Sequence, residues 1–183
     1  MSIHSRDELI EYLNEGNSVK YVFFWGHQKP ESGVSPTCFS QWYDAAFTID
    51  GVQYLTAEHY MMAKKAELFD DASSRDRILN AQTPAEAKKL GRSVHGFDEN
   101  LWLANRFDIV VQGNKAKFMQ NRDLEDFLLS TGKRVLVEAS PTDRIWGIGL
   151  AAQDLDAENP GKWRGLNLLG FALMQVREQL ARM

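Results

Sequence analysis

Glu58 and Lys65 are the first residues in this sequence whose types and spacing suit catalysis. They are seven residues apart in a segment that predicts a helix, and seven residues make nearly two turns. Both side chains should therefore occupy one helical face, with Glu58 in the first turn, where the helix dipole favours a carboxylate. A carboxylate and an amine can both exchange protons at a reaction centre. The plainer interpretation is two solvated charges on an outer surface.

A second candidate segment runs from residue 138 to residue 149 and leaves a predicted strand for a loop rich in Gly and Pro. Functional groups collect on such loops because the scaffold below them is rigid. The segment offers the carboxylates of Glu138 and Asp143, the guanidinium of Arg144 and the indole of Trp146. Two carboxylates can divide into acid and base roles if their environments differ. The plainer interpretation is a surface loop in which Trp146 fills the core.

A third group of candidates is basic and comprises Arg92, Lys115, Lys117, Arg144, Lys162 and Arg164. Arginine suits phosphate because its planar fork binds two oxygens. Arg92 follows Gly91 at a predicted helix end, where a cation also satisfies free carbonyl groups. For Lys115 and Lys117 the plainer interpretation is a solvated helical face.

Several chemistries find no support in the pattern of residues. The four histidines form no H-E-x-x-H motif and no C-x-x-C pair exists, so we expect no metal site. Neither a G-x-G-x-x-G nor a P-loop pattern occurs, and no G-x-S-x-G elbow marks a serine nucleophile. Cys38 has no histidine partner in any known motif and is expected to be a small buried hydrophobe.

Composition indicates one globular domain without membrane segments. The chain has 183 residues, of which 44% are hydrophobic and 25% charged, and its formal net charge is −4. A general nucleic-acid binder would carry a basic excess, so only a local basic channel would suit a nucleic acid. No apolar run approaches the ~20 residues that span a bilayer, and no apolar signal segment opens the chain. A single cysteine fits a reducing cytoplasm.

The elements that must position these residues are mostly helices. Asp50-Gly51 between two β-rich runs predicts a type I′ hairpin over residues 47–54. Ser5, Thr56, Thr83 and Asp98 are predicted caps of helices, and Asn167 is the predicted cap of the last one. The expected helices cover 6–15, 57–69, 84–90, 98–118, 123–130 and 168–181, and buried strands cover 19–25 and 135–139. The fold class is therefore α+β, a helix-rich single domain with a small, partly antiparallel sheet.

Taken together, these segments resemble the NADAR (NAD- and ADP-ribose-associated) or YbiA-like N-glycosidase family. The match covers about residues 20–180, and residues 1–19 form an accessory helix outside it. Some family members have Phe-Ser-Asn-Phe where this chain has Phe39-Ser40-Gln41-Trp42. The matching pieces include residues 24–26, 38–42, 47–51, 56–66, 90–92, 117–118, 129–132, 136–149 and 165–170.

The resemblance implies cleavage of a ribose C1–N bond and assigns roles to the candidates. Glu58 would stabilise an oxocarbenium-like centre or activate water, and Asp143 would protonate the leaving nitrogen or orient ribose hydroxyls. Lys65 would act by its charge or as an amine that forms a Schiff base. Arg92 and Lys117 would hold phosphate, and a tryptophan would stack on the base. The remaining predicted substrate contacts are Trp25, Ser40, Trp42, Trp146, Gly147 and Asn167.

Three functions remain open from the sequence. The first is hydrolysis of phosphoribosylaminopyrimidine intermediates of riboflavin biosynthesis, a small ribosyl phosphate substrate. The second is removal of ADP-ribose from guanine bases, the one case in which a nucleic-acid partner is expected. The third is a non-catalytic sensor of ADP-ribose or NAD, which would not require Glu58, Lys65 and Asp143 together. No cofactor and no membrane partner are expected, and the expected location is the cytoplasm.

Overall fold

The structure, a computed structural model, describes residues 3–183. Its contacts divide the chain into two compact units. Unit 1 contains the residues up to Ser40 together with Asp123–Met183, and unit 2 is Gln41–Arg122. The predicted helical accessory segment at 1–19 and catalytic domain at 20–183 stay a prediction, and residues 1 and 2 lie outside the described range. No helix within residues 3–183 is both long and apolar enough to cross a membrane.

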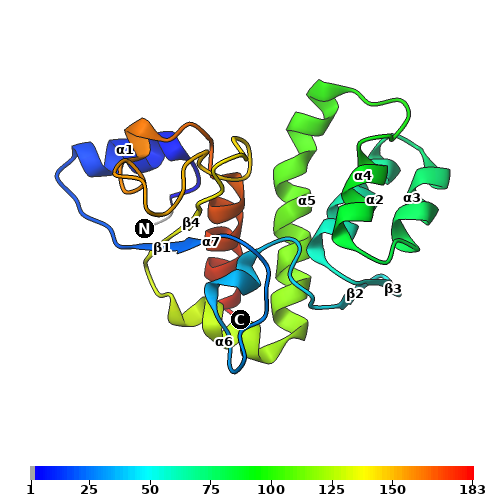
Figure 1. Ribbon diagram of the computed structural model, residues 1–183, viewed down its shortest axis with the longest axis horizontal. Helices are drawn as coiled ribbons and strands as arrows, with labels where there is room; N and C mark the ends of the chain where they lie inside the picture. Colours follow the sequence, from blue (N-terminus) through cyan, green and yellow to red (C-terminus); the bar gives the residue numbers. More distant parts are fainter. Residues whose placement is uncertain (1–2) are drawn as a thin grey trace. The chain divides into compact units, whose positions relative to one another are not determined.

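Unit 1 is built on a two-stranded parallel sheet with α7 packed on β4 (Figure 1). Strand β1 pairs with β4 in a register that sets Tyr21 opposite Val135 and Phe24 opposite Glu138. The helix and the strand share a core of fully buried aliphatic side chains that includes Leu136 and Leu173. The elements are α1 (Arg6–Asn14), β1 (Tyr21–Phe24), η1 (Pro36–Phe39), α6 (Arg122–Ser130), β4 (Val135–Glu138), η2 (Pro160–Lys162) and α7 (Leu168–Leu180).

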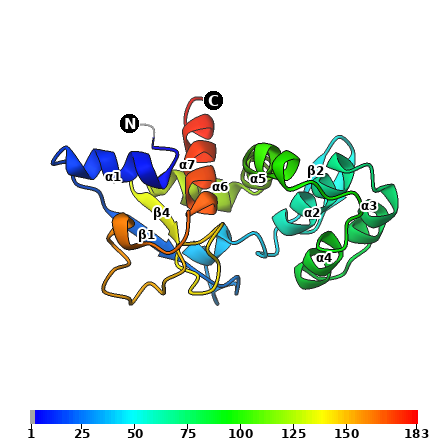
Figure 2. The same cartoon turned by 90° about the horizontal axis from the view of Figure 1, so that it is seen from above.

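The parallel pairing brings two predicted site segments to one sheet edge. Both strands end at the same side, and the N–H of Ala139 donates to the carbonyl of Phe24 at 2.9 Å. Trp25 therefore leaves β1 beside the point where the segment from residue 139 leaves β4. The carboxyl ends of parallel strands are where open α/β sheets place their ligands. Figure 2 shows this sheet below α1 and α7.

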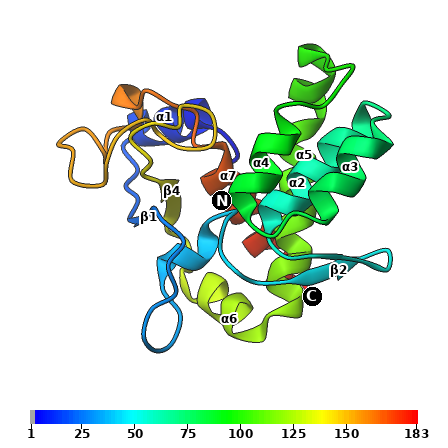
Figure 3. The ribbon, with the colours of Figure 1, turned by 45° about the vertical axis from the view of Figure 1, so that its right-hand side comes forward.

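Unit 2 is a cluster of helices with a β-hairpin beside it (Figure 3). Helix α2 packs against α3, α4 and α5 and so forms the centre of this unit. A Cβ at Gly113 of α5 would lie 2.5 Å from Cδ1 of Tyr60, so the glycine permits α2 and α5 to approach closely. The elements are β2 (Phe47–Ile49), β3 (Val52–Tyr54), α2 (Ala57–Leu68), α3 (Ala72–Leu79), α4 (Pro84–Gly91) and α5 (Glu99–Gln120).

The predicted α+β class and most local signals are confirmed. Asp50 and Gly51 have φ values of 51° and 79°, as a type I′ hairpin requires. The side chains of Ser5, Thr56, Thr83 and Asp98 accept N–H bonds as helix caps. The strands separate into one parallel and one antiparallel pair.

Other local predictions were wrong. Helix α3 was not predicted, because its apolar periodicity is weak and Asp71 caps it from an unrecognised position. Gly91 belongs to the last turn of α4 instead of following the helix. Strand β1 is shorter than predicted, and only Phe24 in it is fully buried.

Asn167 is not the side-chain cap that we predicted for the last helix. It has a left-handed backbone, with φ 55°, and its side chain makes no cap hydrogen bond. Its Oδ1 instead accepts from the N–H of Glu138 at 2.9 Å, and its Nδ2 donates to the carbonyl of Leu136 at 2.9 Å. The fully buried amide thus fastens the start of α7 to β4. The competing hydrogen bonds of the strand end explain why the cap does not form.

His59 anchors the first turn of α2, next to Glu58. Its ring is buried, with Nδ1 2.8 Å from the Thr56 hydroxyl and Nε2 3.1 Å from the carbonyl of Ala81. Because the carbonyl is only an acceptor, Nε2 carries the proton and Nδ1 accepts from Thr56. Burial lowers the pKa of His59 below its ordinary value of 6.5. The ring is therefore neutral in the folded protein at neutral pH.

This burial predicts an acid-sensitive stability. A histidine with a lowered folded pKa binds more protons when unfolded, so its contribution is present above pH 6.5 and is lost as pH falls. Urea unfolding of the protein between pH 7.5 and pH 5 should show decreasing stability, and His59→Gln should flatten that decrease. If the free energy of unfolding fell equally with pH in the wild-type protein and in His59→Gln, a neutral, buried His59 would not be the cause of the acid sensitivity.

Candidate active site

Glu58 lies in the protein interior rather than on a solvated face. Only 3% of the residue is exposed, although it stands in the first turn of α2. Its backbone N–H donates to the carbonyl of Gln41 at 2.9 Å, which fixes the turn that carries the carboxylate. The plainer interpretation of a solvated glutamate is thus wrong. A buried carboxylate requires hydrogen-bonding or charged partners, because an isolated charge is costly to remove from water.

Further buried polar side chains come from α5 and from the start of unit 2, where Gln41 accepts the backbone N–H of Glu58. Asn114 donates from Nδ2 to Oε1 of Gln41 at 2.7 Å and to the carbonyl of Val110 at 2.9 Å. Lys117 lies one turn further along α5 and is fully buried, with Nζ 5.6 Å from the ring centre of Tyr43. We call Gln41, Glu58, Asn114 and Lys117 the buried polar cluster. The expectation of a solvated Lys117 is corrected, because α5 turns this face inward.

Lys65 stands in the last turn of the same helix as Glu58. Seven residues of helix separate the two along the axis by roughly 10 Å. Its Nζ donates to the carbonyl of Gly91 at 2.8 Å and lies 4.5 Å from the ring centre of Phe97 and 5.6 Å from that of Trp102. Burial, and then the charge of Arg92, lower the pKa of Lys65. A lowered pKa makes the neutral amine more available at neutral pH.

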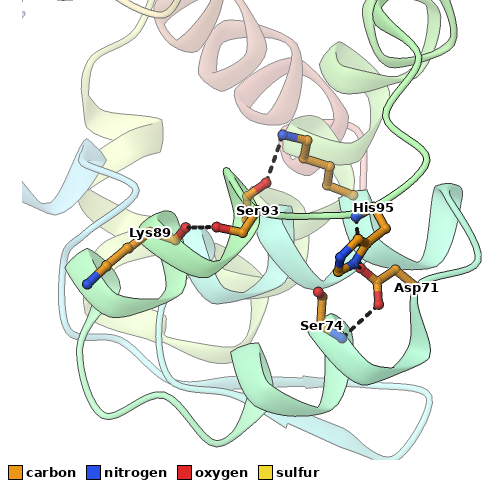
Figure 4. Close-up of polar contacts among 7 residues, drawn as sticks. Asp71, Ser74, Lys89, Ser93 and His95 are labelled. Atoms are coloured by element: carbon orange, nitrogen blue, oxygen red, sulfur yellow. Dashed lines mark hydrogen bonds and ion pairs between the residues drawn. The ribbon is translucent and has the colours of Figure 1, made fainter.

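The segment that follows α4 carries Arg92 and is held by a separate hydrogen-bond network (Figure 4). Asp71 accepts from the N–H of Ser74 at 3.0 Å and, through Oδ2, from the N–H and Nδ1 of His95 at 2.9 and 3.0 Å. The hydrogen bond with the Ser74 side chain, followed by those from the backbone N–H groups of His95 and Ser74, holds the pKa of Asp71 well below its usual range. Ser93 also donates to the carbonyl of Lys89. Arg92 itself is exposed to solvent on this fixed segment.

The loop after β4 is organised by Asp143. Its Oδ1 accepts the backbone N–H groups of Ile145 and Trp146, both at 2.8 Å, and that of Gly147 at 3.5 Å. The N–H of Asp143 in turn donates to the hydroxyl of Ser140 at 3.1 Å. Three backbone N–H groups of the loop thus converge on one carboxylate oxygen of Asp143, which fixes the shape of the loop. Both predicted roles of Asp143, protonation of the leaving nitrogen and orientation of ribose hydroxyls, stay predictions.

Gly147 is required for close packing in this loop. A Cβ at this position would lie 2.9 Å from the carbonyl oxygen of Glu138 and 3.1 Å from that of Asp143. The carbonyl of Gly147 also accepts from the N–H of Asn167 at 3.1 Å. Strand end, loop and the start of α7 therefore form one hydrogen-bonded structure in unit 1.

The predicted aromatic contacts occupy different settings. Trp25 follows β1 and is 62% exposed, whereas the sequence placed it in a buried strand over residues 19–25. Trp42 is half-buried in unit 2, and Nζ of Lys88 lies 5.7 Å from its ring centre. Trp146 is half-buried rather than a core plug, and Ser40 is half-buried at the end of η1.

Comparison with known proteins identifies the family. The NADAR domain model matches residues 23–181. The chain belongs to the NADAR family. An N-glycosidase of Acanthamoeba polyphaga mimivirus is 46% identical over 165 residues, which cover 87% of this chain and 96% of the relative.

The chain is also similar to a riboflavin biosynthesis protein and to a solved structure. A riboflavin biosynthesis protein of Vibrio vulnificus is 33% identical over 141 residues, covering 77% of this chain and 35% of that protein. The NMR structure of the E. coli protein YbiA superposes with a TM-score of 0.69 at 26% identity. That match covers 91% of this chain and 88% of the YbiA chain.

Within each unit the NADAR structure groups several predicted site residues. Unit 2 carries Glu58 and Lys117 in the buried polar cluster, and Lys65 beside the segment of Arg92. Unit 1 carries Asp143, Trp146 and Gly147 in one hydrogen-bonded loop. No three His, Cys, Asp or Glu side chains among residues 3–183 gather in a way that could hold a metal ion.

Sequence reasoning missed two members of the buried polar cluster. Gln41 and Asn114 were not among the predicted site residues, although the hydrogen bond between them joins the start of unit 2 to α5. An asparagine three residues before a lysine on a long helix was the available signal. It could not be recognised, because the burial of that face depends on packing against α2.

Proposed function

We propose that this protein is an N-glycosidase that hydrolyses the ribose C1–N bond of phosphoribosylaminopyrimidine intermediates of riboflavin biosynthesis. One observation carries the proposal: a single helix, α2, holds a buried carboxylate in its first turn and an amine of lowered pKa in its last turn. A glycosidase needs a carboxylate near the anomeric carbon. A neutral amine can also bring about cleavage of the C1–N bond, by forming a Schiff base with C1. The names of the relatives support this substrate class.

Glu58 is the proposed catalytic carboxylate. Positive charge develops on C1 and its attached nitrogen when the ring opens and again in the protonated Schiff base, and a fixed carboxylate in a water-poor setting stabilises it strongly. The same oxygen atoms can accept a proton from the attacking water. The hydrogen bond from the Glu58 N–H to Gln41 keeps the first turn in place throughout.

Lys65 is proposed to act as a neutral amine on the opened sugar. Opening of the ring breaks the C1–O4′ bond, transfers the proton of the exocyclic N–H to O4′ and leaves an imine between C1 and the exocyclic nitrogen. Attack by Nζ forms a new C1–N bond, and loss of the aminopyrimidine as a free amine leaves a lysine Schiff base. Water then adds to C1 and releases the sugar phosphate as an aldehyde, which restores Lys65. The lowered pKa of Lys65 favours this route over a purely electrostatic one.

Arg92 is assigned to the phosphate, and the remaining predicted contacts complete the substrate. Arg92 is open to solvent, and Lys117, which is fully buried on α5, stays a second predicted phosphate contact. Asp143 stays the predicted proton donor to the leaving nitrogen or the predicted acceptor for ribose hydroxyls. Trp25, Trp42 or Trp146 stays the predicted stacking partner of the base. Ser40, Gly147 and Asn167 stay predicted contacts. No cofactor is invoked, and we propose a cytoplasmic location on the basis of the single cysteine.

The Arg92 assignment predicts a specific kinetic change. Arg92→Ala should raise KM for a phosphorylated substrate by about tenfold while kcat changes little, because a charge-assisted phosphate contact far from C1 is made equally in ground and transition states. Steady-state kinetics on substrates with and without the 5′-phosphate would measure the effect. For the dephosphorylated substrate, the wild-type protein and Arg92→Ala should have the same KM. An unchanged KM for the phosphorylated substrate in Arg92→Ala would remove Arg92 from the site.

The proposed function itself is tested with two substrates side by side. Purified protein would be incubated with a phosphoribosylaminopyrimidine and with an ADP-ribosylated guanine, and released sugar phosphate would be followed by mass spectrometry. We expect release from the pyrimidine. Release from guanine alone would replace the proposal with the ADP-ribosyl hydrolase, and binding of ADP-ribose without any release would replace it with the sensor.

A further inference from the structure

Unit 1 contains a cavity of about 540 Å³ that none of the predicted site residues lines. Lys20 directly precedes β1 and Arg134 directly precedes β4, so the cavity lies at the amino-terminal ends of the two parallel strands. Trp25 and the Asp143 loop follow the opposite, carboxyl-terminal ends. Within unit 1 the cavity and the segments assigned to the glycosidase site therefore lie at opposite ends of the sheet.

The lining of this cavity is strongly basic. It carries five cationic side chains and one carboxylate, on Lys20, Lys133, Arg134, Arg177, Arg182 and Glu178. The whole chain has a formal net charge of −4, so this concentration of positive charge is local. The single carboxylate, Glu178, lies 4.0 Å from Nη2 of Arg182. A concave surface with one dominant sign of charge attracts ligands of the opposite sign.

Arg177 gives the cavity a guanidinium that protein hydrogen bonds hold in one orientation. It is 7% exposed, and its Nη1 donates to Oγ1 of Thr131 at 2.7 Å and to the carbonyl of Arg134 at 2.9 Å. Among the described residues both bonds use Nη1, so Nε and Nη2 remain for a ligand. Burial lowers the pKa of Arg177, yet an arginine keeps its charge at any physiological pH. The guanidinium is thus oriented before a ligand arrives.

We propose that this cavity binds a phosphorylated small molecule. A locked guanidinium with exposed cations around it matches the geometry and charge of a phosphate. The volume falls within the range of ~300–1,000 Å³ that is usual for small-molecule sites. Tyr12 and Met174 line the same cavity and supply apolar surface for the organic part of the ligand.

The site also gives the N-terminal segment of the chain a role. Tyr12, Ser18, Val19 and Lys20 line the cavity, whereas the NADAR match begins at residue 23. The proposed ligand site is therefore built partly from residues that precede the family match.

The test is binding of inorganic phosphate and of adenosine monophosphate to the full chain, measured by calorimetry and by NMR shifts of the Thr131 and Gly132 amides. Lys133→Glu reverses an exposed charge of the cavity and should weaken binding by about tenfold or more. Arg77→Glu, an exposed residue of α3 in unit 2, makes the same change of net charge and should leave binding unchanged. Arg92→Ala separates this site from phosphate binding in the proposed active site.

The outcomes decide between three interpretations. Binding that shifts the two amides, survives Arg92→Ala and is lost in Lys133→Glu supports the site. Tighter binding of the nucleotide than of phosphate supports the organic ligand, whereas equal binding of the two would overturn it and indicate a site for phosphate alone. Equal weakening by Arg77→Glu, loss with Arg92→Ala, or no binding at all would overturn the proposal.

Discussion

Glu58→Gln is expected to lower kcat by about 10³-fold, because the amide cannot stabilise positive charge at C1 or accept a proton from water. The exchange preserves the size of the side chain. It also keeps the backbone hydrogen bond between residue 58 and the Gln41 carbonyl. Substrate binding should therefore change little, so that kcat falls and KM does not rise. Single-turnover release of sugar phosphate would measure the chemical step directly.

Glu67→Gln is the matched control for this experiment. Glu67 lies on the same helix and receives the same chemical change, but it is half-buried and pairs with Lys64 at 2.7 Å. Its variant should keep most of the wild-type rate. Thermal unfolding of both variants would show whether the fold is retained. A Glu58→Gln enzyme that folds and turns over at a rate close to wild type would remove Glu58 from the mechanism.

Lys65→Arg is expected to lower kcat by more than about 100-fold, because a guanidinium keeps the positive charge but cannot form a Schiff base. The half-buried amine has a pKa below its ordinary value, which is the property that an attacking lysine requires. Borohydride reduction of the wild-type enzyme during turnover should attach the sugar phosphate covalently to Lys65. Peptide mass spectrometry would locate the attachment.

Lys64→Arg is the corresponding control. Lys64 is the neighbouring residue on α2, and its Nζ is paired with Glu67 instead of lying against Phe97 and Trp102. This variant should be active, and it should still be trapped at Lys65. A Lys65→Arg enzyme that retains its rate would refute the Schiff-base route and leave Lys65 with an electrostatic role.

Local signals in the sequence determined where many of the elements begin and turn. Asp50-Gly51 specified the hairpin because positive φ at two successive residues is a property of the residues themselves. Thr56 and Asp98 specified helix starts because their side chains bond N–H groups within three residues. The helix that Thr56 caps carries both Glu58 and Lys65, as the sequence predicted. Helix α3 was missed where such local evidence was weak.

Burial and partners were decided by tertiary structure. From the sequence alone, Glu58 and Lys117 could equally lie on solvated helical faces. The packing of α2 against α5 buries both side chains in the interior of unit 2. Asn167 likewise carries a good capping side chain, yet β4 offers it stronger partners. The physical reason is that caps and turns depend on neighbours in the chain, whereas desolvation depends on surfaces that meet only after folding. The sequence thus determined which helix bears the proposed chemistry, and the fold determined the environment in which its carboxylate and amine act.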